Sequence, residues 1–202
     1  AEITHFFKEG VTETDLAEQL KKIYRDLGAD GLSFEPLFAF GSNAASGHHW
    51  PDDTRLKPGD CILVDIGCTW EGYCSDMTRT FFYKNVTQHQ QEVYHTVLKA
   101  NEEAEKAVTP GIPLSSLDQI ARGIITDKGY GSAFTHRLGH FIEFGDVSSA
   151  SADRAVPGNI FSIEPGVYLE NDMGVRVEDL VLVTDHGHEI LNHFSKELTV
   201  ID

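Results

Sequence analysis

Residues 160–181 read IFSIEPGVYLENDMGVRVEDLV, and this segment is the most informative part of the chain. Glu164 ends the apolar run Phe161-Ser162-Ile163, and Glu178 lies among valines and leucines. A buried carboxylate without a partner is very costly, so each acid needs a cation or a bound proton. Arg176 could instead pair with one of them, because alternate residues of a strand share a face. That salt bridge is the alternative to a metal site.

A second pair of acids lies nearer the N-terminus. Asp65 and Asp76 both stand within runs of apolar residues that are expected to form a hairpin. If the turn is centred between Trp70 and Glu71, the two acids are opposite each other, with Cβ atoms about 5 Å apart. Carboxylates this close repel, so one binds a proton or a cation lies between them. A twisted or bulged hairpin that turns the two side chains apart is the alternative.

The segment His136-Arg137-Leu138-Gly139-His140 adds two histidines. On a strand their even separation places both rings on one side, and Gly139 lets another group approach closely. A structural pair, exposed or hydrogen-bonded in the core, is the alternative. Four acids and a histidine in apolar strands suit Mn²⁺, Co²⁺, Fe²⁺ or Zn²⁺. Bridging acids favour two ions, which together can activate a water for hydrolysis.

Residue periodicity predicts the elements around these side chains. Helical spacing and capping residues predict helices over about 12–27, 87–108 and 114–129. Strand patterns cover about 34–40, 61–67, 73–83, 140–144, 160–168 and 175–184. Paired strands with helices between the pairs indicate an α+β fold with a mainly antiparallel sheet. No linker composition divides the chain, so residues 1–202 are expected to form a single domain.

Composition limits the classes of partner. Lys and Arg number 16 against 32 Asp and Glu, a formal net charge of −16, which repels nucleic acid and anionic membranes. No apolar run is long enough to span a bilayer. Cys61, Cys68 and Cys74 show no disulfide or CxxC spacing, so reduced thiols in a cytoplasmic protein are expected. The chain opens on what reads as the middle of a helix, so an upstream part is expected to be missing.

Five residues in this order, within these strings, resemble the metallopeptidases of the pita-bread fold. They are Asp65, Asp76, His140, Glu164 and Glu178. This family includes methionine aminopeptidases, Xaa-Pro aminopeptidases, prolidases and creatinase. The string Glu164-Pro165-Gly166-Val167-Tyr168 and the step of fourteen residues to Glu178 resemble the prolidase and Xaa-Pro aminopeptidase branch. The resemblance covers nearly the whole chain and implies helices packed on one side of the sheet.

The resemblance also implies roles for these residues. Asp65 is expected to bind one metal, and Asp76 and Glu178 to bridge both. His140 and Glu164 are expected to complete the second site, with Glu164 acting as general base for a metal-bridging hydroxide. Two divalent ions are implied, with Mn²⁺ the first expectation and Co²⁺, Zn²⁺ or Fe²⁺ the others.

The glycine- and histidine-containing segment 41–51 resembles the active-site loop of the family. There His48 matches a histidine that faces the substrate and can donate a hydrogen bond to the developing oxyanion. His49 is an adjacent alternative, and two solvent-exposed histidines are the structural alternative. His136 matches a further family position near the metals.

The chain departs from the family pattern after His140. Phe141 and Glu143 stand where the family usually has glycines. When the sequences are matched without a gap, Val147 occupies the position of the family's second substrate-facing histidine. Bulk at the glycine positions is expected to narrow the pocket. Replacing Val147 with histidine is then expected to raise the cleavage of prolyl peptides.

The expected activity is hydrolysis of the bond after the N-terminal residue of a short peptide, with proline second. Hydrolysis of a non-peptide amide or amidino compound, as in the creatinase branch, is one alternative. A pita-bread domain kept for binding alone is the other. The branch usually carries an additional N-terminal domain and often dimerises, so a short peptide and a second copy of the chain are the expected partners.

Overall fold

The helices begin at residues that cap them. The computed structural model describes residues 2–142 and 146–202. These residues form α1 (Glu13–Asp26), α2 (Gln88–Lys106) and α3 (Leu114–Asp127), with short 3₁₀ helices η1 (Glu2–Phe6), η2 (Gly41–Ala45) and η3 (Gly131–Ala133). Thr12 and Asp15 form a capping box at α1, and Thr87 and Gln90 form one at α2. The three predicted helices are therefore present, each ending within about two residues of its expected last residue.

The strands form several small sheets. They are β1 (Gly31–Leu32), β2 (Leu37–Phe40), β3 (Cys61–Ile66), β4 (Cys68–Trp70), β5 (Tyr73–Cys74), β6 (Met77–Tyr83), β7 (Gly139–His140), β8 (Asp146–Val147), β9 (Ile160–Ile163), β10 (Gly166–Leu169), β11 (Met173–Arg176), β12 (Asp179–Thr184), β13 (Gly187–Ile190) and β14 (Val200–Ile201). The largest sheet has the order β14-β6-β3-β2, and β13-β12-β9 and β1-β4-β5 form two more. Strands β10 and β11 pair with each other, as do β7 and β8. Within the described ranges, only the pairing of β14 with β6 is parallel.

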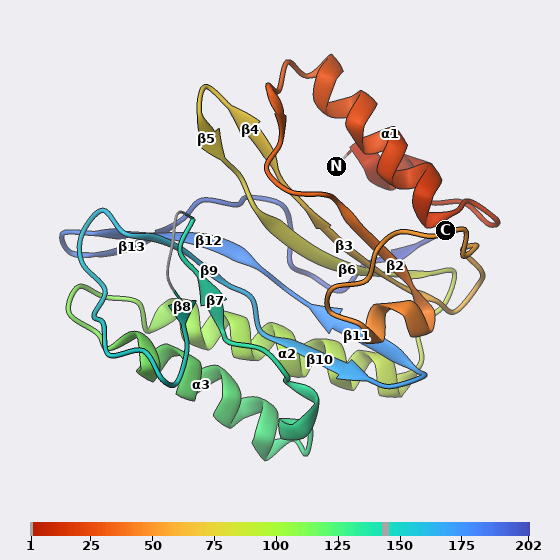
Figure 1. Cartoon of the computed structure of the whole chain (residues 1–202). Coiled ribbons are helices and arrows are strands. Elements are labelled where there is room, and N and C mark those ends of the chain that lie inside the picture. The colour runs from red at the N-terminus through yellow and green to blue at the C-terminus, as the bar shows by residue number, and fades with distance from the viewer. Residues whose placement is uncertain (1, 143–145) are drawn as a thin grey trace.

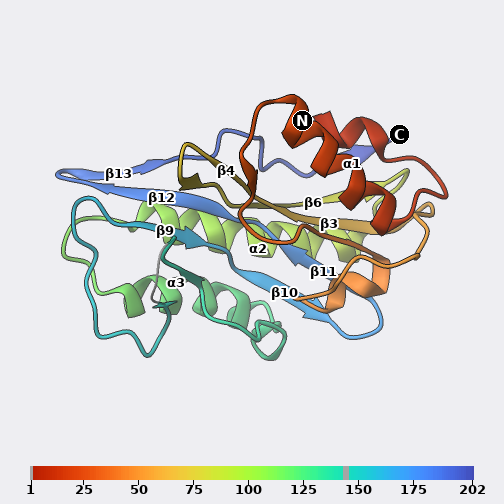
Figure 2. The same ribbon diagram turned by 45° about the horizontal axis from the view of Figure 1, so that its top comes forward.

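Two apolar cores lie on opposite faces of β2 and β3. Leu37 and Ala39 of β2 join the core formed with α2, α3 and β9–β12, whereas Phe38 and Phe40 join the core formed with α1 and η1. This alternation follows from the period of two along a strand. Figure 1 shows α2 and α3 below the strands and α1 above them at the other end of the molecule, and Figure 2 shows the same arrangement after a turn. The expectation that the helices pack on one side of the sheet holds for α2 and α3. Helix α1 departs from it, because it packs on the other face of β2 and β3.

The hairpin register differs from the expected one. Asp65 pairs with Thr78 rather than Asp76, because the turn is centred between Glu71 and Gly72. Both turn residues have positive φ, 50° and 84°, which is the geometry of a tight two-residue hairpin turn. The shift moves the partner of Asp65 by two positions, so the faces are unchanged. Asp65 and Asp76 become diagonal neighbours.

Two of the expected long strands are interrupted at their acids. The expected strand 160–168 ends at Ile163 and resumes at Gly166, so Glu164 lies between β9 and β10. The expected strand 175–184 breaks in the same way around Glu178, between β11 and β12. Pro165 lacks a backbone N–H and cannot continue the ladder, which accounts for the first break. Each break frees an acid from the regular alternation of strand side chains.

Among the described residues, no helix is long and apolar enough to cross a bilayer.

Candidate metal centre

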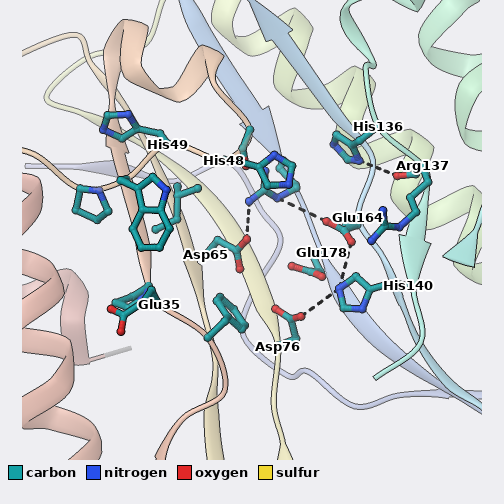
Figure 3. Close-up of a pocket in the computed structure, with 17 residues that line it drawn as sticks. Glu35, His48, His49, Asp65, Asp76, His136, Arg137, His140, Glu164 and Glu178 are labelled. Carbon is teal, nitrogen blue, oxygen red and sulfur yellow. Dashed lines mark hydrogen bonds and ion pairs between the residues drawn. The ribbon is translucent and has the colours of Figure 1, made fainter. Parts of the chain in front are cut away.

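The predicted site residues come together in one cavity of about 460 Å³. Its lining includes every residue proposed from the sequence as a metal ligand or catalytic group: Asp65, Asp76, His140, Glu164, Glu178, His48 and His136. The first five come from five different parts of the sheets, and Figure 3 shows their side chains pointing toward a common space. The sequence order that suggested the site therefore corresponds to real proximity.

Asp76, His140 and Glu178 form the tightest group. Each offers one ligand atom, and these atoms all lie within 4.8 Å of one another. His140 Nε2 lies 3.5 Å from Asp76 Oδ2 and 3.6 Å from Glu164 Oε1. His140 Nδ1 lies 3.0 Å from the Phe141 carbonyl, to which it can donate its proton. Such a bond leaves the lone pair of Nε2 directed at the acids, as in a metal-binding histidine.

The buried acids carry more negative charge than their surroundings neutralise. Burial raises the pKa of Asp65, of Glu164 to about 7, and of Glu178 well above its usual range, and the neighbouring acids add to each effect. The pKa of His140 is raised to about 9, first by its bond with Asp76. A cation bound among these groups would oppose each shift, because it favours ionised carboxylates and a neutral imidazole.

One buried carboxylate oxygen of the site, Asp65 Oδ1, accepts no hydrogen bond from the described residues. The hydroxyl of Thr78, opposite Asp65 in the sheet, donates instead to Glu178 Oε2 at 2.7 Å. An unpaired buried acceptor is costly, so a bound cation would satisfy it. The donor set of four acids and one imidazole fits two hard or borderline divalent ions.

The sequence offers Arg176 as an alternative partner for Glu164 or Glu178, but its shortest contact with an acid is with Asp65. Its Nη2 lies 2.5 Å from Asp65 Oδ2, and its Nε lies 3.9 Å from Glu164 Oε2. Its Nη1 donates to the Tyr168 hydroxyl at 2.8 Å. One guanidinium does not neutralise Asp65, Glu164 and Glu178 together, so the salt bridge does not rule out a metal site among these acids.

The two predicted catalytic histidines differ in environment. His136 Nε2 lies 2.8 Å from the Tyr168 hydroxyl, and burial lowers the pKa of His136 to about 4, so its ring is neutral near pH 7. His48 also lines the cavity, and Figure 3 shows it beside the acids. His49 touches the rim of the cavity as well, but its Nε2 lies 2.7 Å from the buried carboxylate of Glu13. His49 is therefore engaged away from the acids, whereas His48 faces them.

The expected effects of the departures after His140 are wrong where the structure describes them. Phe141 pairs with Phe161 across the sheet and packs edge-on against its ring, so it does not line the cavity. Val147 is fully buried in the core that contains α3. It does not occupy the place of a substrate-facing histidine, because it is buried in this core and is not among the residues that line the cavity. Glu143 lies outside the described residues.

Known proteins share this architecture. The profile of metallopeptidase family M24 matches residues 1–185. An uncharacterized peptidase of Staphylococcus aureus strain MW2 is 43% identical over 196 residues, which cover 95% of this chain and 56% of that protein. The chain thus spans little more than half the length of this curated relative.

Solved structures agree with the sequence match. An X-Pro aminopeptidase of Thermotoga maritima superposes with a TM-score of 0.95 at 34% identity, over 99% of this chain and 58% of that one. A prolidase of Pyrococcus furiosus superposes with a TM-score of 0.92 at 33% identity, over 96% of this chain and 59% of that one. A Xaa-Pro dipeptidase of Bacillus anthracis superposes with a TM-score of 0.95 at 32% identity, over 98% of this chain and 57% of that one. The chain belongs to metallopeptidase family M24, and its fold is the pita-bread fold of the prolidase branch.

Proposed function

We propose that the protein is a two-metal peptidase that releases the N-terminal residue of short peptides, with proline preferred second. The observation that carries this proposal is the convergence of four acids and His140 on one cavity, where no described residue donates a hydrogen bond to Asp65 Oδ1. The similarity to an X-Pro aminopeptidase, a prolidase and a Xaa-Pro dipeptidase supports the substrate class. We propose residues 1–202 as one catalytic domain, and a second copy of the chain as a partner.

The geometry of the cavity and the family support the following assignment of ligands. Asp65 would hold one cation, Asp76 and Glu178 would bridge two, and His140 with Glu164 would complete the second position. Two divalent ions, Mn²⁺ first and Co²⁺, Zn²⁺ or Fe²⁺ otherwise, would act as Lewis acids toward the substrate carbonyl and the attacking water. Arg176 holds Asp65 in place through its hydrogen bond.

The protein's own side chains would move the protons. Glu164 would accept a proton from the attacking water and return it to the leaving nitrogen. Its Oε1 accepts a hydrogen bond from the Ser162 hydroxyl at 3.0 Å, which fixes the carboxylate. His48, which lines the cavity, would donate a hydrogen bond to the oxygen that becomes negative in the transition state. Neutral His136, held by Tyr168, offers a second polar group on the same wall.

One assay separates this proposal from its alternatives. The purified protein is stripped with a chelator, reloaded with Mn²⁺, Co²⁺ or Zn²⁺, and given matched Xaa-Pro and Xaa-Ala dipeptides and tripeptides. We expect about two ions per chain and cleavage that favours proline. Cleavage only of non-peptide amides would move the protein to the creatinase type. Metal uptake without turnover of any substrate would indicate that the protein is a pita-bread domain kept for binding alone.

A further inference from the structure

One buried carboxylate gathers the loop that carries His48. Glu13 opens α1 and is fully buried. Its Oε1 accepts hydrogen bonds from the Phe40 N–H at 2.8 Å and from Asn43 Nδ2 at 3.0 Å. Its Oε2 lies 2.7 Å from His49 Nε2 and accepts the Asp52 N–H at 3.1 Å. A single side chain therefore ties the end of β2, the helix η2 and two later points of the loop to the start of α1.

All hydrogen-bonding positions of this carboxylate are in use. An ionised carboxylate accepts about four hydrogen bonds, and Glu13 has four donors around it. Burial raises the pKa of the Glu13 carboxyl, and the bonds from Asp52, His49, Phe40 and Asn43 oppose that effect. Charge-assisted bonds of this kind are about twice as strong as neutral ones. The anchor is thus a strong one for a segment without regular secondary structure beyond η2.

The loop is held from its other side by Arg176 and Tyr168, which lie next to the candidate metal ligands. The Gly47 carbonyl accepts a hydrogen bond from Arg176 Nη1 at 3.2 Å. Gly47 also packs so closely against Tyr168 that an added Cβ would lie 3.2 Å from its ring. His48 thus stands between an inner contact at Gly47 and an outer contact at His49. Figure 3 shows His48 turned toward the acids and His49 away from them.

We propose that Glu13 is a positioning residue for the active site, which fixes His48 and Trp50 at the cavity through its bond with His49. Both His48 and Trp50 line the cavity, and each is the immediate neighbour of His49 in the chain. The inference rests on the proposed function for its kinetic consequence, but not for the anchoring itself. A shift of about 1 Å at a catalytic group can cost roughly 100-fold in rate.

A third metal ion is the competing interpretation of this cluster. Glu13, His49 and Asp52 offer ligand atoms within 4.8 Å of one another. However, the distance of 2.7 Å from Glu13 Oε2 to His49 Nε2 is that of a direct hydrogen bond. The remaining positions of the Glu13 carboxylate are occupied by N–H groups, which repel a cation. We therefore assign the cluster to the loop and not to a metal.

The first test uses kinetics with matched variants. Glu13→Gln places an amide N–H against existing donors, and we expect kcat to fall roughly 10- to 100-fold, with KM changed less and two ions still bound. His49→Leu should behave alike, whereas His49→Gln retains a donor and should recover most of the rate. Glu18→Gln, on the exposed side of α1, is the control and should match the wild type. Wild-type kinetics in Glu13→Gln, or equal loss in both His49 variants, would overturn the proposal.

The second test measures the mobility of the loop and does not depend on catalysis. In a Trp70→Phe background Trp50 is the remaining tryptophan, and it borders His49. We expect Glu13→Gln and His49→Leu to increase the fast nanosecond component of its fluorescence anisotropy decay, and His49→Gln to leave it unchanged. Unchanged decays in all variants would refute the anchor even if the wild type cleaves no peptide. Binding of three Mn²⁺ ions by the wild type and two by Glu13→Gln would establish the metal interpretation instead.

Discussion

Glu164 stands where β9 stops, and its position makes a sharp test of the proposed chemistry. The change Glu164→Gln keeps the size of the side chain and the acceptor for Ser162 but removes the proton acceptor. We expect kcat to fall by about 10²- to 10⁴-fold, which is the usual contribution of a general base. Steady-state kinetics on an Xaa-Pro dipeptide, with metal content measured alongside, provide the check.

Glu170→Gln is the matched control, because Glu170 is exposed just after β10 and lies outside the cavity. It should leave kcat and metal content unchanged. Full activity in Glu164→Gln, with two ions bound, would remove Glu164 from the mechanism.

Val147 allows a second test at the level of one side chain. The structure reverses the sequence-based expectation that Val147→His would improve prolyl cleavage, because Val147 is buried in the core beside α3. An imidazole there would lack hydrogen-bond partners and be too large, so we expect the free energy of unfolding to fall by about 1–3 kcal/mol. Urea denaturation provides the measurement. Val156→His, at a position 55% exposed, should change little; higher activity in Val147→His at unchanged stability would contradict this placement.

The packing of β11 against η2 sets the geometry between two elements. Gly174 of β11 lies against the backbone of Ala44, and an added Cβ would overlap the Ala44 carbonyl. We expect Gly174→Ala to push η2 outward, to lower stability by about 1–3 kcal/mol and to reduce turnover, because the same loop carries His48. Thermal unfolding and peptide cleavage would both report it.

Gly187→Ala in β13 is the control for that change. Among the described residues, no atom lies within 4 Å of a Cβ added at Gly187, so stability and turnover should remain as in the wild type. Equal effects of the two substitutions would show that the loss of glycine, and not the contact with η2, is responsible.

Local signals predicted the helices, and long-range contacts explain what they could not predict. The capping residues Thr12 and Thr87 act within three positions of the chain, so they fixed the starts of α1 and α2. The hairpin register was wrong by one turn position, because the centring on Glu71 and Gly72 depends on two residues adopting positive φ. The strand breaks at Glu164 and Glu178 were also missed.

The site was predicted better than its surroundings. The five candidate ligands stand out because acids are rare in apolar strands, and the structure brings all of them to one cavity. The contacts of Arg176 with Asp65 and Tyr168 span many positions or join different strands, so no local pattern gives them. Glu13 was missed for the same reason: it looks like an ordinary acid in the first turn of a helix.

Metal binding should stabilise the whole fold, because the candidate ligands join several separate sheets. Two cations would stabilise the ionised forms of Asp65, Glu164 and Glu178, whose pKa values are raised by burial and, to a smaller extent, by the neighbouring acids. At a free Mn²⁺ concentration 100 times the Kd, linkage predicts a gain of about 3 kcal/mol for each site. Calorimetry with and without chelator measures it. Asp76→Asn should lose most of the gain, and a melting temperature insensitive to metal would refute the site.

A second buried cluster connects distant parts of the molecule without touching the cavity. Glu105 of α2 lies 2.6 Å from Lys196, which lies 3.0 Å from Asp179 at the start of β12. Arg79 of β6 also pairs with Asp179, at 2.7 Å. Within the described ranges nothing donates a hydrogen bond to Glu105 Oε1 or to Asp179 Oδ2, so a proton on Glu105 would let it donate to the Asp179 carboxylate.

This cluster should give global stability a measurable pH dependence. Burial raises the pKa of Glu105 from 4.5 to about 7. The folded state then holds the proton more tightly than the unfolded chain, so the free energy of unfolding falls as the pH rises from about 4.5 to about 7. We expect this part of the loss to be on the order of 1–3 kcal/mol. Glu105→Gln should remove it, because the amide carries its hydrogens at every pH. Urea denaturation of both proteins at several pH values provides the difference, and Glu103→Gln, 42% exposed on the same helix, is the control. A constant difference between Glu105→Gln and wild type across this range would show that Glu105 is already ionised in the fold.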